Sequence, residues 1–129
     1  MGLAERKVVV EVKETDFKAF EAKVKALCGY DVGIRFDWAT LENNEECTSI
    51  CSNKRYNGYM FDRIIEVFTS VCADSIGKGA VEEKLKSISL IPVAGQAEFS
   101  NGILTVRNDL TGNGAYSADK IKTILEEGL

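Results

Sequence analysis

Alternating and helical patterns of apolar residues predict the elements of the N-terminal third. Every second residue from 8 to 12 is valine, which predicts a first strand over 7–13, and a second alternation predicts a strand over 32–37. Between them, apolar residues recur at intervals of three and four over 16–28. This spacing predicts an amphipathic helix that ends at Gly29.

The rest of the chain shows further helices and strands. The clearest helical stripe predicts a helix at 58–75, and a glycine-rich break separates it from a shorter helix at 79–86. Alternation predicts a strand at 87–91. Asn101 and Gly102 form the dipeptide most typical of a two-residue hairpin turn, because both central residues of a type I′ turn have positive φ.

The hairpin sets a register, and the last helix follows it. The Asn-Gly turn places Phe99 opposite Leu104, with both side chains on one face of the sheet. Ser117 precedes apolar residues at helical spacing and is predicted to cap a C-terminal helix.

These elements predict one α+β domain over 1–129. We expect two layers, with a mostly antiparallel sheet of four to five strands and helices packed on one face. The predicted core consists of the apolar residues of these patterns: Val8, Val10, Phe20, Val24, Leu27, Ile34, Phe36, Ile64, Ile65, Phe68, Ile88, Leu90, Phe99, Leu104, Val106, Ile121 and Leu125.

The composition of the chain excludes several classes of function. The 129 residues are 45% apolar, which suits a domain that folds without disulfides or metal. The net charge of −4 provides no basic field for nucleic acid or an anionic membrane. The chain has no histidine, which excludes Ser-His-Asp and Cys-His catalysis and histidine-ligated zinc. Glu11 interrupts the only apolar stretch near the N-terminus, so we expect a cytoplasmic protein without a membrane segment.

Four cysteines are expected to be free thiols in a reducing compartment. Cys28 and Cys72 lie on the apolar stripes of their helices, so we expect them in the core. Cys47 and Cys51 are expected to be exposed or half-buried loop thiols, and a metal site or a redox pair is the alternative. No second close pair completes a zinc site, so we expect no metal and no cofactor.

The loop before the last helix carries a weak candidate anion site. Gly114 and Ser117 lie where free N–H groups at a helix start can bind an anion. A plain capped connection explains the same residues, because Ser117 already has a capping role.

The segment 38–59 is the strongest candidate for a binding surface. It is polar and lacks a sustained period, with short helices expected around 39–43 or 46–51. Loops on a rigid scaffold tend to carry binding residues, which here combine aromatic anchors with charges for steering. Aromatic residues at such positions also tuck a loop onto the core. The candidate binding residues are Trp38, Glu42, Glu45, Glu46, Lys54, Arg55, Tyr56 and Tyr59.

These observations favour a small non-catalytic binding domain that recognises a protein partner or a second copy of itself. The alternative is a small enzyme or ligand-binding protein that uses carboxylate, Lys, Tyr or Cys chemistry in a cleft, since no imidazole is present. A deep pocket that gathers polar groups with shifted pKa values would favour the alternative.

Overall fold

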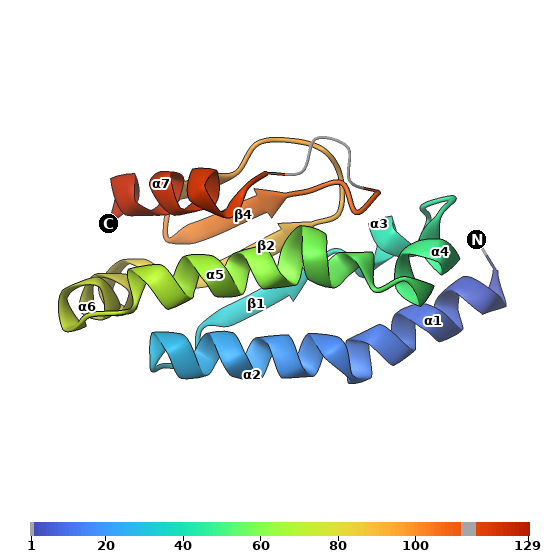
Figure 1. The fold of residues 1–129 in the computed structure, drawn as a ribbon, viewed down its shortest axis with the longest axis horizontal. Coiled ribbons are helices and arrows are strands. Elements are labelled where there is room, and N and C mark those ends of the chain that lie inside the picture. Colours follow the sequence, from blue (N-terminus) through green and yellow to red (C-terminus); the bar gives the residue numbers. More distant parts are fainter. Residues whose placement is uncertain (1, 112–115) are drawn as a thin grey trace.

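Helices and a four-stranded sheet make up an α+β fold, shown in the computed structural model of Figure 1. The structure describes residues 2–111 and 116–129. In chain order the elements are α1 (Leu3–Glu14), α2 (Asp16–Cys28), β1 (Gly33–Phe36), α3 (Trp38–Glu42), α4 (Cys47–Ser52), the π-helix η1 (Asn57–Phe61), α5 (Asp62–Val71), α6 (Ser75–Lys84), β2 (Ser87–Ile91), β3 (Glu98–Ser100), β4 (Ile103–Arg107) and α7 (Ala118–Gly128).

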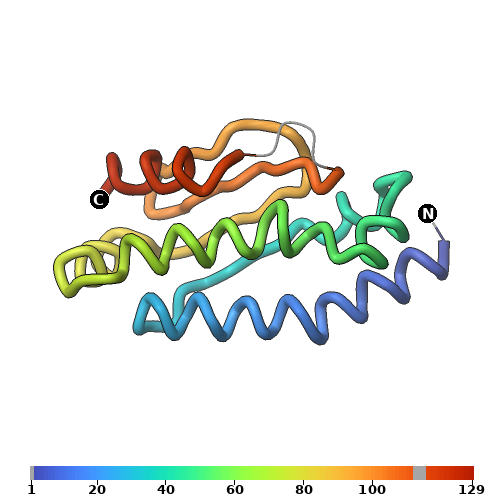
Figure 2. The backbone as a smooth tube through the Cα atoms, viewed as in Figure 1, coloured from blue at the N-terminus to red at the C-terminus, as the bar shows by residue number. Residues whose placement is uncertain are grey.

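The first element is the helix α1, so the predicted strand over 7–13 is wrong. Val9 and Val12, three residues apart, are buried, whereas Val10 of the predicted core is 47% exposed and Val8 is half-buried. Packing of α1 against α2, α3 and α4 outweighs the preference of valine for strands. In Figure 2, α1 and α2 follow one another along one side of the molecule with a bend between them.

The sheet has the order β1-β2-β4-β3, in which β1, β2 and β4 are parallel and β3 pairs antiparallel with β4. The prediction of a mostly antiparallel sheet is therefore wrong. Helices α3 to α6 return the chain to the starting end of the sheet before β2, as a parallel pair requires. Residues 92–97 then lead to the far edge, and the hairpin places β4 between β2 and β3.

The predicted hairpin and its register are confirmed. Asn101 and Gly102 both have positive φ, of 54° and 78°, and Phe99 pairs with Leu104. The two turn residues thus determine the hairpin and its register without long-range contacts, as expected for an Asn-Gly turn.

One face of the sheet forms part of the core. Ile88, Leu90, Leu104 and Val106 are fully buried, and α5 and α7 lie in front of the strands in Figure 1. The predicted core residues that are buried are Phe20, Val24, Phe36, Ile64, Phe68, Ile88, Leu90, Leu104, Val106, Ile121 and Leu125. Others pack against the core while half-buried: Val8, Leu27, Ile34, Ile65 and Phe99.

Helix α6 begins at Ser75, four residues earlier than predicted, and includes both glycines of the predicted break between the helices, Gly77 and Gly79. Asp74 caps the helix, because its side chain accepts a hydrogen bond from the backbone N–H of Gly77 at 2.7 Å. The preceding helix, predicted over 58–75, consists of the π-helix η1 followed by α5, and it ends at Val71 because residues 72–74 form the turn before α6.

An aromatic cluster joins α2, β1 and η1 beneath the segment after α4. The Phe61 ring stacks on Phe20 with centroids 4.4 Å apart, and lies 5.9 Å from Phe17 and Phe36 and 5.5 Å from Tyr56. Such pairs add to the free energy gained from burial alone. The cluster therefore fixes the backbone that carries Tyr56.

Candidate functional site

The segment 38–59 is folded against α1 and contains both of the short helices that the sequence suggests, α3 and α4. Asp37 caps α3 by accepting hydrogen bonds from the backbone N–H and the hydroxyl of Thr40. Leu41 and Ile50 are buried, so this polar segment supplies part of the core.

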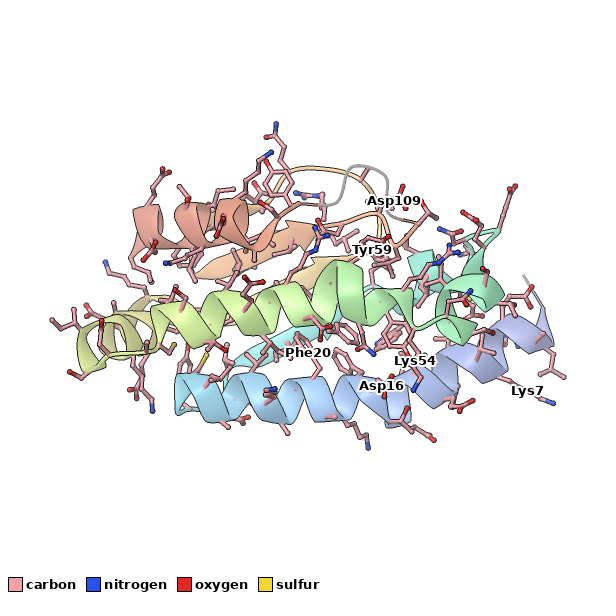
Figure 3. All side chains as sticks on the ribbon, in the orientation of Figure 1. Lys7, Asp16, Phe20, Lys54, Tyr59 and Asp109 are labelled. Atoms are coloured by element: carbon pink, nitrogen blue, oxygen red, sulfur yellow. The ribbon has the colours of Figure 1, made fainter. Side chains whose placement is uncertain are left out.

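A cleft of about 210 Å³ lies between the junction of α1 with α2 and the end of α4. Its polar groups come from two distant parts of the chain. Glu11 and Asp16 lie on the first side, and Cys51, Lys54 and Tyr56 lie on the second. Figure 3 shows Lys54 and Asp16 close to each other at this junction.

Tyr56 and Asp16 form the central contact of the cleft. The hydroxyl of Tyr56, a side chain only 2% exposed, donates a hydrogen bond of 2.6 Å to Asp16 Oδ2. The amide of Asn57 donates to the same oxygen at 3.4 Å. Burial, reinforced by the hydrogen bond to Asp16, raises the pKa of Tyr56 above its usual value. The phenol stays protonated at neutral pH and holds the carboxyl group of Asp16 in place.

The thiol of Cys51 lines the cleft in its protonated form. Burial raises its pKa to about 12, and the neighbouring thiol of Cys47 adds to the shift. Burial also raises the pKa of Cys47. Both residues are buried on α4, so the expectation of exposed or half-buried loop thiols is wrong. Across residues 2–111 and 116–129, no three Cys, Asp, Glu or His side chains are grouped to hold a metal ion.

We expect the buried thiols to react very slowly with iodoacetamide near pH 7.5. Burial raises the pKa of Cys28 and of Cys51 from 9.0 to about 12, which lowers the reactive thiolate fraction about a thousandfold. The half-buried Cys72 is expected to react first. Mass spectrometry of digested protein measures each rate, and urea-unfolded protein is the control, in which all four react. Native rates for Cys51 equal to those in urea would contradict this expectation.

Lys54 lies in the turn after α4 in an uncommon backbone conformation. Its φ is 52°, in the left-handed region that residues other than glycine rarely adopt. Its side chain is exposed at the edge of the cleft. The turn therefore places one ammonium group beside the two carboxylates of Glu11 and Asp16.

Of the predicted binding residues, only Lys54 and Tyr56 line this cleft. Trp38 is half-buried, and its ring lies 5.0 Å from Phe17 and 4.3 Å from Phe36. Tyr59 is a half-buried residue of η1, and its backbone carbonyl accepts a hydrogen bond from Asn108 Nδ2 at 2.6 Å. Both aromatic residues thus hold the segment to the rest of the fold.

The charged candidates lie around the segment. Glu42 pairs with Arg6 of α1 at 3.4 Å. Glu45 and Glu46 are exposed just before α4, and Arg55 is half-buried. A binding role for these four residues stays a prediction.

The candidate anion site near α7 is described only in part. The hydroxyl of Ser117 accepts a hydrogen bond from the backbone N–H of Lys120 at 3.3 Å, which confirms the predicted cap. Gly114 lies outside the described residues. Anion binding here stays a prediction.

The sequence pattern does not indicate Glu11 and Asp16 as residues of a binding cleft. Tyr56 and Asp16 are 40 residues apart, and the alternating valines pointed to a strand where Glu11 lies on a helix. The cleft can bind a ligand through two carboxylates, an ammonium group and a fixed phenol.

In the described part of the chain no helix has the length and apolar character needed to cross a membrane. Comparisons of this chain with protein-family models, with curated proteins and with solved structures gave no match.

Proposed function

We propose that this chain is a binding domain without chemistry of its own, which recognises a segment of a protein partner by holding one basic side chain in the cleft. The observation that carries the proposal is the carboxyl group of Asp16, fixed by Tyr56 at 2.6 Å in a cleft that Glu11 also lines. Charge-assisted hydrogen bonds to a pre-oriented carboxylate are among the stronger polar contacts in proteins.

The charges of the cleft favour a ligand that carries a cationic group and, next to it, a hydrogen-bond acceptor. The two hydrogen bonds that Asp16 accepts within the described residues both use Oδ2, which leaves Oδ1 as an acceptor for a ligand. Lys54 can donate to a carbonyl oxygen of the same ligand. A lysine or arginine side chain with its own backbone carbonyl provides both groups.

The size of the cleft and its surroundings support a peptide partner. About 210 Å³ is less than the roughly 300–1,000 Å³ of typical small-molecule sites, and it suits one side chain. The exposed Glu45 and Glu46 and the net charge of −4 would steer a basic partner toward this side. Free cysteines suit a reducing compartment, so we place this binding in the cytoplasm.

The pKa shifts support binding over catalysis. Burial raises the pKa of Cys51 to about 12, so this thiol is not a ready nucleophile at neutral pH. Burial also raises the pKa of Tyr56, which keeps its hydroxyl occupied as a donor to Asp16. A small amine that uses the same carboxylates is the second candidate ligand, because the cleft is small.

Selection from a displayed library of random heptapeptides tests the proposal. We expect lysine or arginine to be enriched at one position of the selected peptides. Asp16→Asn removes the charge and keeps an acceptor for Tyr56, and it is expected to weaken a selected peptide at least tenfold, which is about 1.4 kcal/mol. Thermal denaturation verifies that the variant is folded.

Glu127→Gln is the matched control, because it removes one exposed negative charge on α7, outside the cleft lining. This variant is expected to keep the affinity within about threefold. Selected peptides without a basic residue would contradict the proposal, as would equal losses in the two variants. Binding of a capped lysine as tight as that of the peptide would favour the small-amine ligand instead.

A further inference from the structure

The second face of the sheet carries small and polar side chains and is open to solvent. Ser87, Ser89 and Thr105 are half-buried, while Arg35 is exposed and Ile103 is 40% exposed. Sheets of parallel strands are normally covered on both faces. This face is therefore a site where a second surface would complete the usual arrangement.

The strand register arranges this face as a row with opposite charges at its two ends. Arg35 pairs with Ser89, Ser89 with Thr105, and Thr105 with Glu98. The row therefore runs from a positive charge on β1, through two hydroxyl groups, to a negative charge on β3. Glu98 forms an ion pair with Arg107 of the same face at 3.2 Å, and its side chain stays 57% exposed. None of the ion pairs in the described chain involves Arg35.

We propose that this face binds the same face of a second copy of the chain, related by a two-fold axis parallel to the strands. Rotation about this axis reverses the order of the strands across the sheet of the second copy. It leaves each residue at the same position along the strand direction. Arg35 then faces Glu98 of the second copy, twice per dimer, so that each Glu98 lies between Arg107 of its own copy and Arg35 of the other. Ser89 faces Thr105. In the two adjacent rows Ser87 faces Ile103, where a small side chain meets a large one, and Ile91 faces Arg107. The face is thus complementary to itself, as a two-fold interface requires.

The size of the face predicts a weak dimer. The four strands are spaced about 4.8 Å apart, and each is about five residues long with a rise of about 3.3 Å per residue. The area of the sheet face is therefore on the order of 300 Å² per copy. Stable complexes bury about 800 Å² per partner, so we expect transient association that increases with protein concentration. Because two pairs of opposite charges contribute, added salt is expected to weaken the dimer.

Sedimentation equilibrium from about 10 µM to about 1 mM protein tests the dimer, since weak association requires this range. Arg35→Glu and Glu98→Arg each place like charges opposite one another, and each variant alone is expected to dimerise at least tenfold more weakly. An equimolar mixture of the two variants places opposite charges together again at both ends. The mixture is therefore expected to recover a dimer within about threefold of the wild-type constant.

Lys18→Glu is the matched control, because it makes the same change of charge at an exposed position on α2. It is expected to leave the dimerisation constant unchanged. A wild-type protein that stays monomeric at 1 mM would overturn the proposal. A mixture that stays as monomeric as its two components would overturn it too, as would a loss in Lys18→Glu equal to that in Arg35→Glu.

Discussion

Replacing Phe61 by alanine is expected to lower the free energy of unfolding by about 3–5 kcal/mol. The side chain is fully buried, and its ring contacts Phe20, Phe17 and Tyr56. Truncation leaves a cavity at the place where α2, β1 and η1 meet, and the surrounding rings cannot all move to fill it. Urea denaturation followed by circular dichroism measures the change.

Ile76→Ala provides the control, because it also shortens an apolar side chain, but one that is 84% exposed. Its effect on the free energy of unfolding is expected to stay within about 0.5 kcal/mol. A Phe61→Ala variant as stable as Ile76→Ala would show that the aromatic cluster does not form the centre of the core.

Two glycines of α6 are expected to respond to alanine in opposite directions. At Gly77, an added Cβ would overlap the backbone carbonyl oxygen of Val71, so part of the turn before the helix must shift. We expect Gly77→Ala to destabilise the protein by about 1–3 kcal/mol. At Gly79, an added Cβ meets no atom within 4 Å. Gly79→Ala is expected to stabilise it by about 0.5–1 kcal/mol, because alanine is the better helix former.

Thermal or urea denaturation of the two variants side by side measures this difference. Each serves as the control for the other, since helix propensity changes equally in both. Equal stabilisation by the two substitutions would mean that Val71 does not approach the first turn of α6.

Local signals in the sequence were sufficient for several elements. The helix over 16–28 and the strand over 87–91 have the predicted bounds, because each combines a regular apolar period with a clear terminator. The Asn101–Gly102 hairpin was also predicted with its register, because the turn chemistry alone determines it.

Long-range packing decided the features that the sequence did not reveal. Consecutive valines fit a strand or a helix, and burial of Val9 and Val12 against neighbouring helices selected the helix. The position of β4 between β2 and β3 depends on the path of residues 92–97, which carry no signal for it. The cleft was missed because Asp16 and Tyr56 meet only after α2 and η1 have packed together.

An NMR titration with two small probes tests the proposed binding most directly. N-acetyl-arginine amide presents the basic group and a carbonyl oxygen, and N-acetyl-glutamate amide is the probe of opposite charge. We predict that the arginine probe shifts the backbone amide signals of Glu11, Asp16, Lys54 and Tyr56, and that Asp16→Asn abolishes these shifts while Glu127→Gln preserves them. The glutamate probe is expected to leave the four signals in place. Shifts confined to other parts of the chain, or equal shifts with both probes, would contradict recognition of a basic side chain by this cleft.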